Sequence, residues 1–442
     1  MANTHLTRTS GTSTNTDIFT ISTWIKRSEL DDNDFFVYAT GGNSDDNWFQ
    51  VGFANDNKFI ISAYNTVWLK TNRVFRDVNA WYHIVIKADS PQGTASNRLK
   101  LYVNGVEETS FTTDNRSSIS QGQTWGWNKN SIVHYIGSKA GSNYFDGYLS
   151  HFHFSDGYAY DASTFGSTDS TTGEWKINTS PSFTLGTNGF TILKDGNTIT
   201  DQSTNSNNWT LAGGTLTKTE DCPSNVFATW NPLFPAGGSL NYDAGNTRLY
   251  NTGTAAYRTS VSTLGASTGK FYAEFKCEGD TFFTGVIDIN STKMGINDTT
   301  FGSSSSMTAY GYGIFNSTGN VMNNASTVVS GYSAALANGD ILGIALDATN
   351  KKLYFAKNGV WQNSGVPTSG STGTGAISLA SGDRTWVFAS SVNGTNISAN
   401  FGNGYFNETA VSSAGTNASG NGIFEYDVPT GFTALSTKGL NL

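Results

Sequence analysis

The chain has 442 residues, of which 13% are aromatic and only 14% are charged, and its 34 acidic and 26 basic residues leave a net charge of −8. This length predicts two domains of about 200 residues each. The aromatic content excludes a disordered chain, and the lack of any Lys or Arg run argues against a nucleic-acid-binding protein. No stretch is apolar and long enough for a membrane span or a signal peptide, so we expect synthesis in a cytoplasm without an export signal.

The first third of the chain is a series of short strands separated by Asp, Asn, Gly and Ser. Phe19–Ile25 alternates large apolar with small polar side chains, which is the period of a strand with one buried face. Asn104-Gly105 tolerates positive φ at both positions and therefore predicts a type I′ hairpin turn. Further strands are expected at Phe35–Tyr38, Trp48–Phe53, Phe59–Tyr64, Trp81–Lys87, Ile132–Gly137 and Tyr144–Phe154. Regular spacing of short strands is typical of a β-sandwich.

A loop-rich connector with short strands is expected over residues 166–240, and a second strand series follows over residues 241–408. Asn358-Gly359 predicts another hairpin turn, and Trp386–Phe401 predicts a third hairpin. Residues 409–442 form a Gly/Ser-rich C-terminal segment, in which residues 412–422 favour a flexible surface stretch and Ile423–Tyr426 a terminal strand. The other strands of the series are expected at Lys270–Lys276, Phe282–Ile289, Ala309–Phe315, Gly339–Asp347 and Lys352–Trp361.

Several of these strings resemble known domain families. Phe19–Ile25, Leu99–Gly105 and Phe145–Phe154 are similar to the laminin-G-like, concanavalin-type jelly roll, over residues 1–165. Gly339–Asp347 and Leu353–Trp361, with a later Ala-Asn-Phe-Gly string, resemble a SPRY-type β-sandwich. The resemblances imply an all-β chain with two β-sandwich domains, a jelly roll and then a SPRY-like sandwich.

The joining strings resemble a family of bacteriophage virion proteins. They are Asp156–Gly166, Asn205–Thr210, Cys222–Leu233 and Pro429–Leu435, and they occur in this order in that family. The resemblance spans nearly the whole chain and implies a phage structural or adsorption protein located in the virion.

No catalytic arrangement can be read from the sequence, so we expect a protein that is not an enzyme. Glycoside hydrolysis is the activity to exclude in a jelly roll, and it needs two carboxylates that flank the scissile bond. Residues two apart on a strand share a face, so a Glu-X-Asp-X-Glu string is the economical arrangement, and it does not occur here. Glu274, Glu278 and Asp280 come nearest, interrupted by Lys276, Cys277 and Gly279.

Other chemistry-bearing groups favour structural roles. His151 and His153 alternate on one predicted strand and are expected to face solvent together without a third metal ligand. The acidic loops at 31–34 and 45–46 leave a calcium ion open as an alternative, but no ligand string assigns one. No cofactor or metal site is therefore predicted. Cys222 and Cys277 are expected to be two thiols.

A tryptophan pair is the candidate binding site. Trp125 and Trp127 lie two residues apart in a loop rich in Gly, Gln and Asn, and Asn128 follows them. Exposed rings could stack on the apolar faces of sugars while amide side chains bond the hydroxyl groups. The alternative is that the rings cap the sandwich core or lie in a subunit contact.

These observations leave three functions open. The first is a fibre or adhesin component of a phage, which binds host surface polysaccharide. The second is a capsid decoration or head-fibre protein, whose partners are other virion proteins. The third is a SPRY-type peptide-binding adaptor. Repeated display favours a homo-oligomer, with a trimer expected by analogy with fibres.

Overall fold

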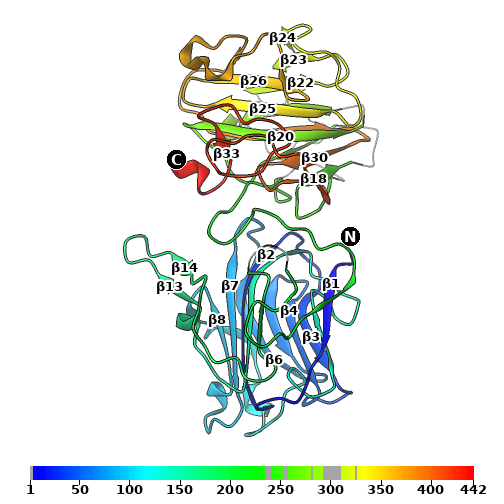
Figure 1. Cartoon of the computed structure of the whole chain (residues 1–442), viewed down its shortest axis with the longest axis vertical. Helices are drawn as coiled ribbons and strands as arrows, with labels where there is room; N and C mark the ends of the chain where they lie inside the picture. Colours follow the sequence, from blue (N-terminus) through cyan, green and yellow to red (C-terminus); the bar gives the residue numbers. More distant parts are fainter. Residues whose placement is uncertain are drawn as a thin grey trace. The chain divides into compact units, whose positions relative to one another are not determined.

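The computed structural model describes residues 3–194, 196, 198–234, 240–251, 257–279, 282–291, 310–323 and 326–442. The chain divides into two compact units, Met1–Lys218 and Thr219–Leu442. Each unit is built from β-sheets, so the predicted all-β fold class is confirmed (Figure 1). Within the described ranges, no helix has the length and apolarity that crossing a bilayer requires. The described helices are short 3-10 turns: η1 (Ala95–Asn97), η2 (Arg116–Ser118), η3 (Ala162–Thr164), η4 (Ile289–Ser291), η5 (Pro367–Thr372) and η6 (Gly439–Asn441).

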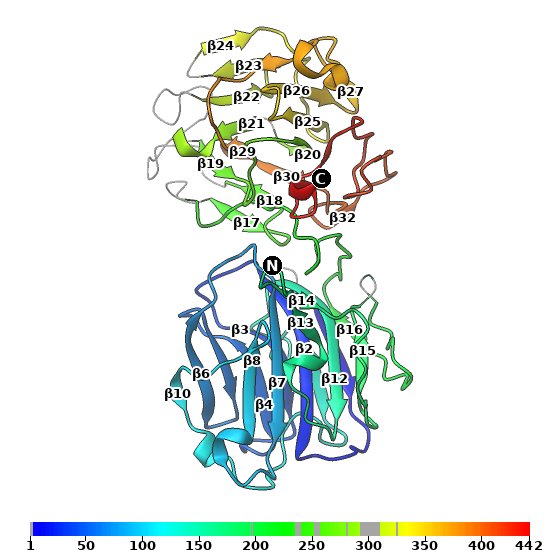
Figure 2. The same ribbon diagram turned by 90° about the vertical axis from the view of Figure 1, so that its left-hand side faces the viewer.

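Two sheets form the sandwich of the first unit (Figure 2). The eight-stranded sheet has the order β10 (Phe111–Asp114), β6 (Val67–Val74), β5 (Lys58–Ser62), β4 (Trp48–Phe53), β3 (Asp34–Thr40), β11 (Val133–Ile136), β1 (His5–Thr9) and β16 (Thr210–Gly213). The six-stranded sheet has the order β15 (Phe190–Ile192), β12 (Gly147–Asp156), β2 (Ile18–Arg27), β7 (Tyr82–Asp89), β8 (Leu99–Val103) and β9 (Val106–Glu107). Apolar side chains from both sheets make one core, which includes Phe19, Phe49 and Ile86.

The second unit is also a two-sheet sandwich. Its nine-stranded sheet contains β17 (Asn241–Asp243), β18 (Arg248–Tyr250), β30 (Asn396–Asn400), β20 (Lys270–Glu278), β25 (Ile341–Asp347), β26 (Lys352–Lys357), β27 (Val360–Trp361), β28 (Ile377–Ser378) and β33 (Thr433–Ala434). Its six-stranded sheet has the order β19 (Arg258–Val261), β29 (Trp386–Val392), β21 (Phe282–Asp288), β22 (Gly311–Phe315), β23 (Asn320–Asn323) and β24 (Ser326–Val329). A second core lies between these sheets, around Phe275, Ile344 and Phe388.

Two of the three predicted hairpins are confirmed, and the third is wrong. Asn104 and Gly105 have φ of 48° and 81°, and Asn358 and Gly359 have φ of 49° and 78°, as a type I′ turn between paired strands requires. By contrast, β29 pairs with β19 and β21, whereas β30 pairs with β18 and β20. The chain therefore crosses from one sheet to the other after β29.

The boundary between the units falls inside the segment predicted as a connector. Residues 166–218 belong to the first unit, where β15 pairs with β12, β16 pairs with β1, and Trp209 enters the core. Phe227 and Trp230 are buried in the second unit. The first part of the segment is thus fixed to the first sandwich by Trp209, and the last part to the second sandwich by Phe227 and Trp230. The first part also carries a small hairpin of β13 (Gly166–Thr168) and β14 (Trp175–Ile177).

The C-terminal segment packs on the outer face of the nine-stranded sheet. Phe424, Val428 and Phe432 join Tyr272 and Tyr354 in a buried cluster there. Residues 423–426 form no strand, so the predicted terminal strand is wrong. The side chain of Glu274 instead accepts the backbone N–H groups of Glu425 and Tyr426. The stretch predicted as flexible is hydrogen-bonded: the buried Asn421 donates to Thr433, and Ser412 bonds Glu425. Upstream, β31 (Tyr405–Phe406) pairs with β32 (Thr409–Ala410).

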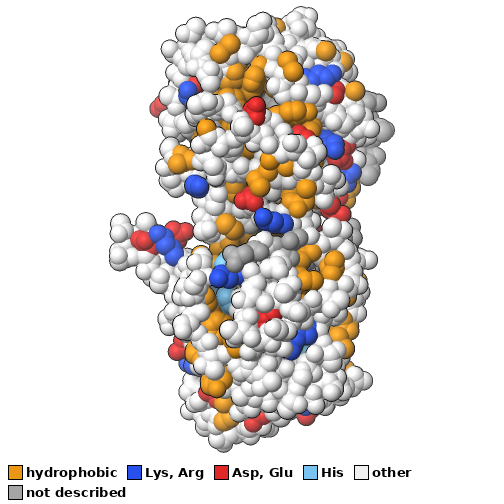
Figure 3. Space-filling view, viewed as in Figure 1, with side chains coloured by type: hydrophobic (Ala, Val, Ile, Leu, Met, Phe, Trp, Pro, Cys, Tyr) orange, Lys and Arg blue, Asp and Glu red, His pale blue; other side chains and the backbone are white. Residues whose placement is uncertain are grey.

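Charged groups are sparse on the face drawn in Figure 3, where Lys, Arg, Asp and Glu side chains are scattered among uncharged surface groups and form no broad patch. This distribution fits the 14% charged content of the sequence.

Candidate ligand-binding surface

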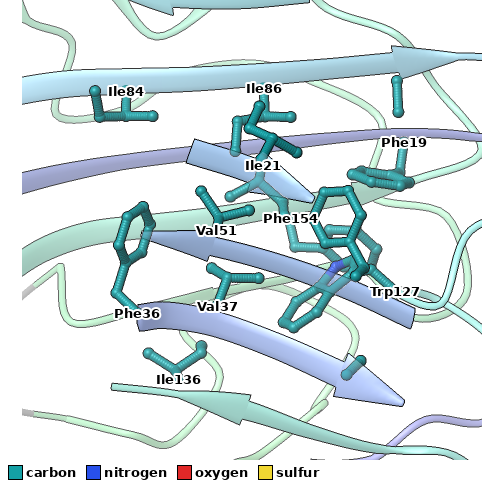
Figure 4. Close-up of a cluster of buried hydrophobic side chains, with 14 of the residues drawn as sticks. Phe19, Ile21, Phe36, Val37, Val51, Ile84, Ile86, Trp127, Ile136 and Phe154 are labelled. Carbon is teal, nitrogen blue, oxygen red and sulfur yellow. The ribbon is translucent and has the colours of Figure 1, made fainter. Parts of the chain in front are cut away.

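The predicted tryptophan pair lies in the core of the first unit, so the expectation of exposed rings is wrong. Trp125 and Trp127 are 0% and 1% exposed. The Trp125 ring packs edge-on against Phe19, Phe49 and Trp68, and its indole nitrogen donates to the carbonyl oxygen of Asp17 at 2.9 Å. Figure 4 shows the Trp127 side chain among the apolar residues that line the two sheets. Neither ring can stack on a sugar in this state.

Asn128 is also buried, and its side chain joins loops rather than a ligand. Its amide nitrogen donates to Asp156 Oδ1 at 2.7 Å, and its amide oxygen accepts from Asn188 at 3.1 Å. Asp156 in turn accepts backbone N–H groups from Thr14 and Asn188. Buried polar groups require such partners, and this network fixes one end of the sandwich.

His151 and His153 lie on one face of β12, with ring centroids 6.2 Å apart, as the alternation predicts, but the expectation that they face solvent is wrong. The β12–β2 pairing shifts register between Ser150 and His153. His151 adopts a φ of 49°, and both side chains are buried. The ring of His153 bonds Thr191 and stacks on Phe165. The segment that follows β12 therefore covers this face of the six-stranded sheet.

The acidic groups are occupied by protein partners. Asp31 accepts from Asn57, Asp34 lies 3.7 Å from Arg27, and Asp45 accepts from Thr66. Glu278 pairs with Arg248 at 2.8 Å, and Asp280 lies outside the described residues. No group of three or more His, Cys, Asp or Glu side chains in the described part of the chain is placed to hold a metal ion.

A strip of aromatic side chains crosses the outer face of the eight-stranded sheet. We define the aromatic strip as His5, Tyr38, Trp48, Tyr64 and Tyr135. Consecutive rings are in contact, with centroids 6.3 Å apart for His5–Tyr135, 5.8 Å for Tyr135–Tyr38, 5.0 Å for Tyr38–Trp48 and 5.2 Å for Trp48–Tyr64. Strands lie about 4.8 Å apart, so a strip that reaches from β1 to the end of β5 spans about 19 Å.

Strand alternation places these rings outward. Phe49, Val51 and Phe53 on β4 belong to the core, so Trp48 and Gln50 point to the opposite face. Tyr38 lies opposite both Tyr135 and Gln50 in the sheet. The same alternation can be read from the sequence. It would have identified the strip as a set of aromatic residues at strand positions that face away from the core.

Polar and charged groups adjoin the rings. Gln50 accepts from the Trp48 indole nitrogen at 3.2 Å and donates to Ser62 at 2.8 Å. The Lys139 ammonium lies 5.2 Å from the Trp48 ring centroid, and burial lowers the pKa of Lys139. Burial between its neighbours raises the pKa of Tyr38 to about 12, so this phenol is neutral and can donate a hydrogen bond.

The partial exposure of the strip suits a ligand. Tyr64 is 43% exposed, and Trp48, Tyr135 and His5 are partly exposed, whereas Tyr38 is buried beneath its neighbours. The surface thus offers ring faces and edges on a rigid sheet, with amide and hydroxyl groups beside them.

Comparisons with known proteins bear on the fold. Residues 2–164 match the laminin-G-type family model of the concanavalin A-like lectin/glucanases superfamily, which confirms the laminin-G-like jelly roll predicted for the first part of the chain. No curated protein matches the chain.

Three solved structures illustrate the structural similarity. The SPRY domain of human HERC1 is 13% identical, with 38% of this chain and 96% of that chain covered and a TM-score of 0.29. Another human SPRY domain is 14% identical, with 37% and 94% covered and a TM-score of 0.27. A protein of Bacteroides ovatus, described as a candidate carbohydrate-binding protein, is 16% identical, with 48% and 57% covered and a TM-score of 0.33.

Proposed function

We propose that the first unit binds polysaccharide on the aromatic strip, in a binding rather than a catalytic role. The observation that carries the proposal is a continuous run of five rings on the outer face of a sheet, beside the hydrogen-bonding side chains of Gln50 and Ser62. Sugar rings combine apolar faces with hydroxyl groups, so aromatic anchors with polar neighbours match both parts.

A flat strip predicts weak binding at each site. A sugar that lies on a sheet face buries little area, and its hydroxyl groups must exchange water for protein partners. Several copies of the chain on one assembly would raise the overall affinity because the second binding event becomes intramolecular.

We further propose that this binding serves a phage particle during attachment to its host. The support is the resemblance of the joining strings, such as Asn205–Thr210 and Cys222–Leu233, to bacteriophage virion proteins. In this setting the chain is a homo-oligomeric adhesin. A decoration protein that contacts only other virion proteins, and a SPRY-type peptide adaptor, remain the alternative functions, and both predict no glycan binding by the strip.

The test replaces Trp48 and Tyr64 by Ala, separately and together, and measures binding of the full chain to a glycan array and then by calorimetry. Loss of one stacked ring should cost about 1 kcal/mol, or roughly fivefold in Kd. Tyr158→Ala is the matched control, because Tyr158 is 40% exposed and lies outside the strip. Unchanged affinity in the double variant, or no glycan binding by the parent chain, would overturn the proposal.

A further inference from the structure

One cation lies on the aromatic strip. The Lys139 ammonium is 5.2 Å from the Trp48 ring centroid and 5.5 Å from that of Phe35, which flanks the strip on β3. Tyr144 lies on the same side and contacts His5, with centroids 5.7 Å apart. The charge is thus held over ring faces at the place where a bound sugar would lie.

Lys139 differs from the other lysines of this sheet and its loops in having no carboxylate partner among the described residues. Lys58 and Lys70 both pair with Asp56, and Lys129 pairs with Asp46. Burial lowers the pKa of Lys139, which indicates a partly desolvated ammonium without local compensation. Such a charge gains most from an anion that is supplied by a ligand.

The acidic groups near the strip are already engaged by protein partners. Asp45 accepts from the backbone of Asn65 and from Thr66, next to Tyr64. Asp46 accepts from Ser44 and lies 3.5 Å from Lys129. Both carboxylates therefore have protein partners, whereas the Lys139 ammonium has no carboxylate partner among the described residues.

We propose that the strip takes an acidic polysaccharide, with a negatively charged sugar stacked near Trp48 and its anionic group on the Lys139 ammonium. The inference rests on the proposed glycan-binding function and adds the chemical class of the ligand. A lysine ammonium acts as a point charge and lacks the planar pair of donors of a guanidinium. Carboxylates and sulfate esters can therefore both bind it.

The experiment compares matched ligands. The full chain is tested by calorimetry against a uronic acid polymer, the same polymer after carboxyl reduction, and a sulfated polymer. Both anionic polymers should bind about five- to tenfold more tightly than the reduced one, and the difference should shrink at high salt. A preference for only one anionic polymer identifies which anion is recognised and still supports the proposal.

Three variants separate the possible explanations. Lys139→Met keeps the apolar stem and should remove the preference for anionic polymers while neutral binding persists. Lys218→Met removes one exposed positive charge elsewhere in the unit and should change nothing. Trp48→Ala should weaken binding of all polymers. Equal binding of neutral and anionic polymers, or a full preference in Lys139→Met, overturns the charge inference alone, whereas binding of none overturns the proposed function with it.

Discussion

At the scale of single residues, Trp125 and Trp127 show how a polar loop can supply core side chains. Gly126 lies between them against the backbone of Trp48, where an added Cβ would sit 2.5 Å from main-chain atoms. The loop therefore presses onto the sandwich, and both indoles enter it. Trp127 packs against His134, with ring centroids 4.5 Å apart, and stacks on Trp209.

Trp125→Ala should destabilise the first unit by about 3–5 kcal/mol, because it removes a fully buried ring and leaves a cavity. Urea unfolding monitored by near-UV circular dichroism measures the change. Trp48→Ala is the control, since its ring is partly exposed on the strip, and we expect a cost below about 1.5 kcal/mol. Equal costs for the two variants would contradict the assignment of Trp125 to the core and Trp48 to the surface.

The sequence predicts residue positions well within strands and poorly in loops. Alternation correctly separates apolar from polar faces in segments such as Phe19–Ile25. It does not predict the cover over His153 or the inward direction of the loop that carries Trp125, because both depend on contacts distant in sequence. Asn128 is a further example, because its side chain is held by hydrogen bonds to Asp156 and Asn188, which are distant in sequence.

At the scale of elements, one buried carboxylate holds the C-terminal segment on the second unit. Glu274 on β20 is 0% exposed and accepts the backbone N–H groups of Glu425 and Tyr426, each at 2.8 Å. Tyr272 donates to the same carboxyl group. These contacts replace a strand ladder, which is why hydrophobic alternation alone does not predict how residues 423–426 are held.

Glu274→Ala should loosen this segment, because two partly buried backbone N–H groups lose their acceptor at a cost of about 1 kcal/mol each. Hydrogen exchange measured by mass spectrometry should show faster exchange in peptides that cover residues 412–428, with little change in the first unit. Glu278→Ala serves as the control, because Glu278 is partly exposed and bonds Arg248 and Ser398 rather than this segment. Unchanged exchange in Glu274→Ala would show that the apolar contacts alone hold the segment.

At the scale of the whole molecule, the two units differ in their titratable groups. All five histidines lie in the first unit. The ring of His83 accepts the indole N–H of Trp175, and the ring of His134 accepts the backbone N–H of Asn128. Neither donor can accept a proton in return, so both imidazoles are held neutral. Burial lowers the pKa of His83, His134 and His153 to about 3.

Glu274 has the opposite effect in the second unit. Burial raises its pKa to about 7, although the N–H groups of Glu425 and Tyr426 oppose that shift. The folded state therefore binds this proton more tightly than the unfolded chain, whose Glu has a pKa of about 4.3. The stability from this group is fully present below that value and is lost as the pH rises through 7. In the first unit, Asp34 has a pKa of about 7 for the same reason and offsets part of the histidine effect.

Acidification from pH 7.5 to pH 5 should thus destabilise the first unit and stabilise the second. An unfolded histidine has a pKa of about 6.5, so each of the three neutral imidazoles lowers the free energy of unfolding of the first unit by about 2 kcal/mol at pH 5. Protonation of Asp34 raises that free energy by about as much as one histidine lowers it. Hydrogen exchange of the full chain in increasing urea, at both pH values and corrected for intrinsic rates, gives the stability of each unit from its own peptides. In Glu274→Gln the gain of the second unit at pH 5 should disappear, because the replaced group no longer titrates, while the loss in the first unit should remain. A shift of both units in the same direction would refute the assignment of these groups, since the histidines and Glu274 act with opposite sign over this range.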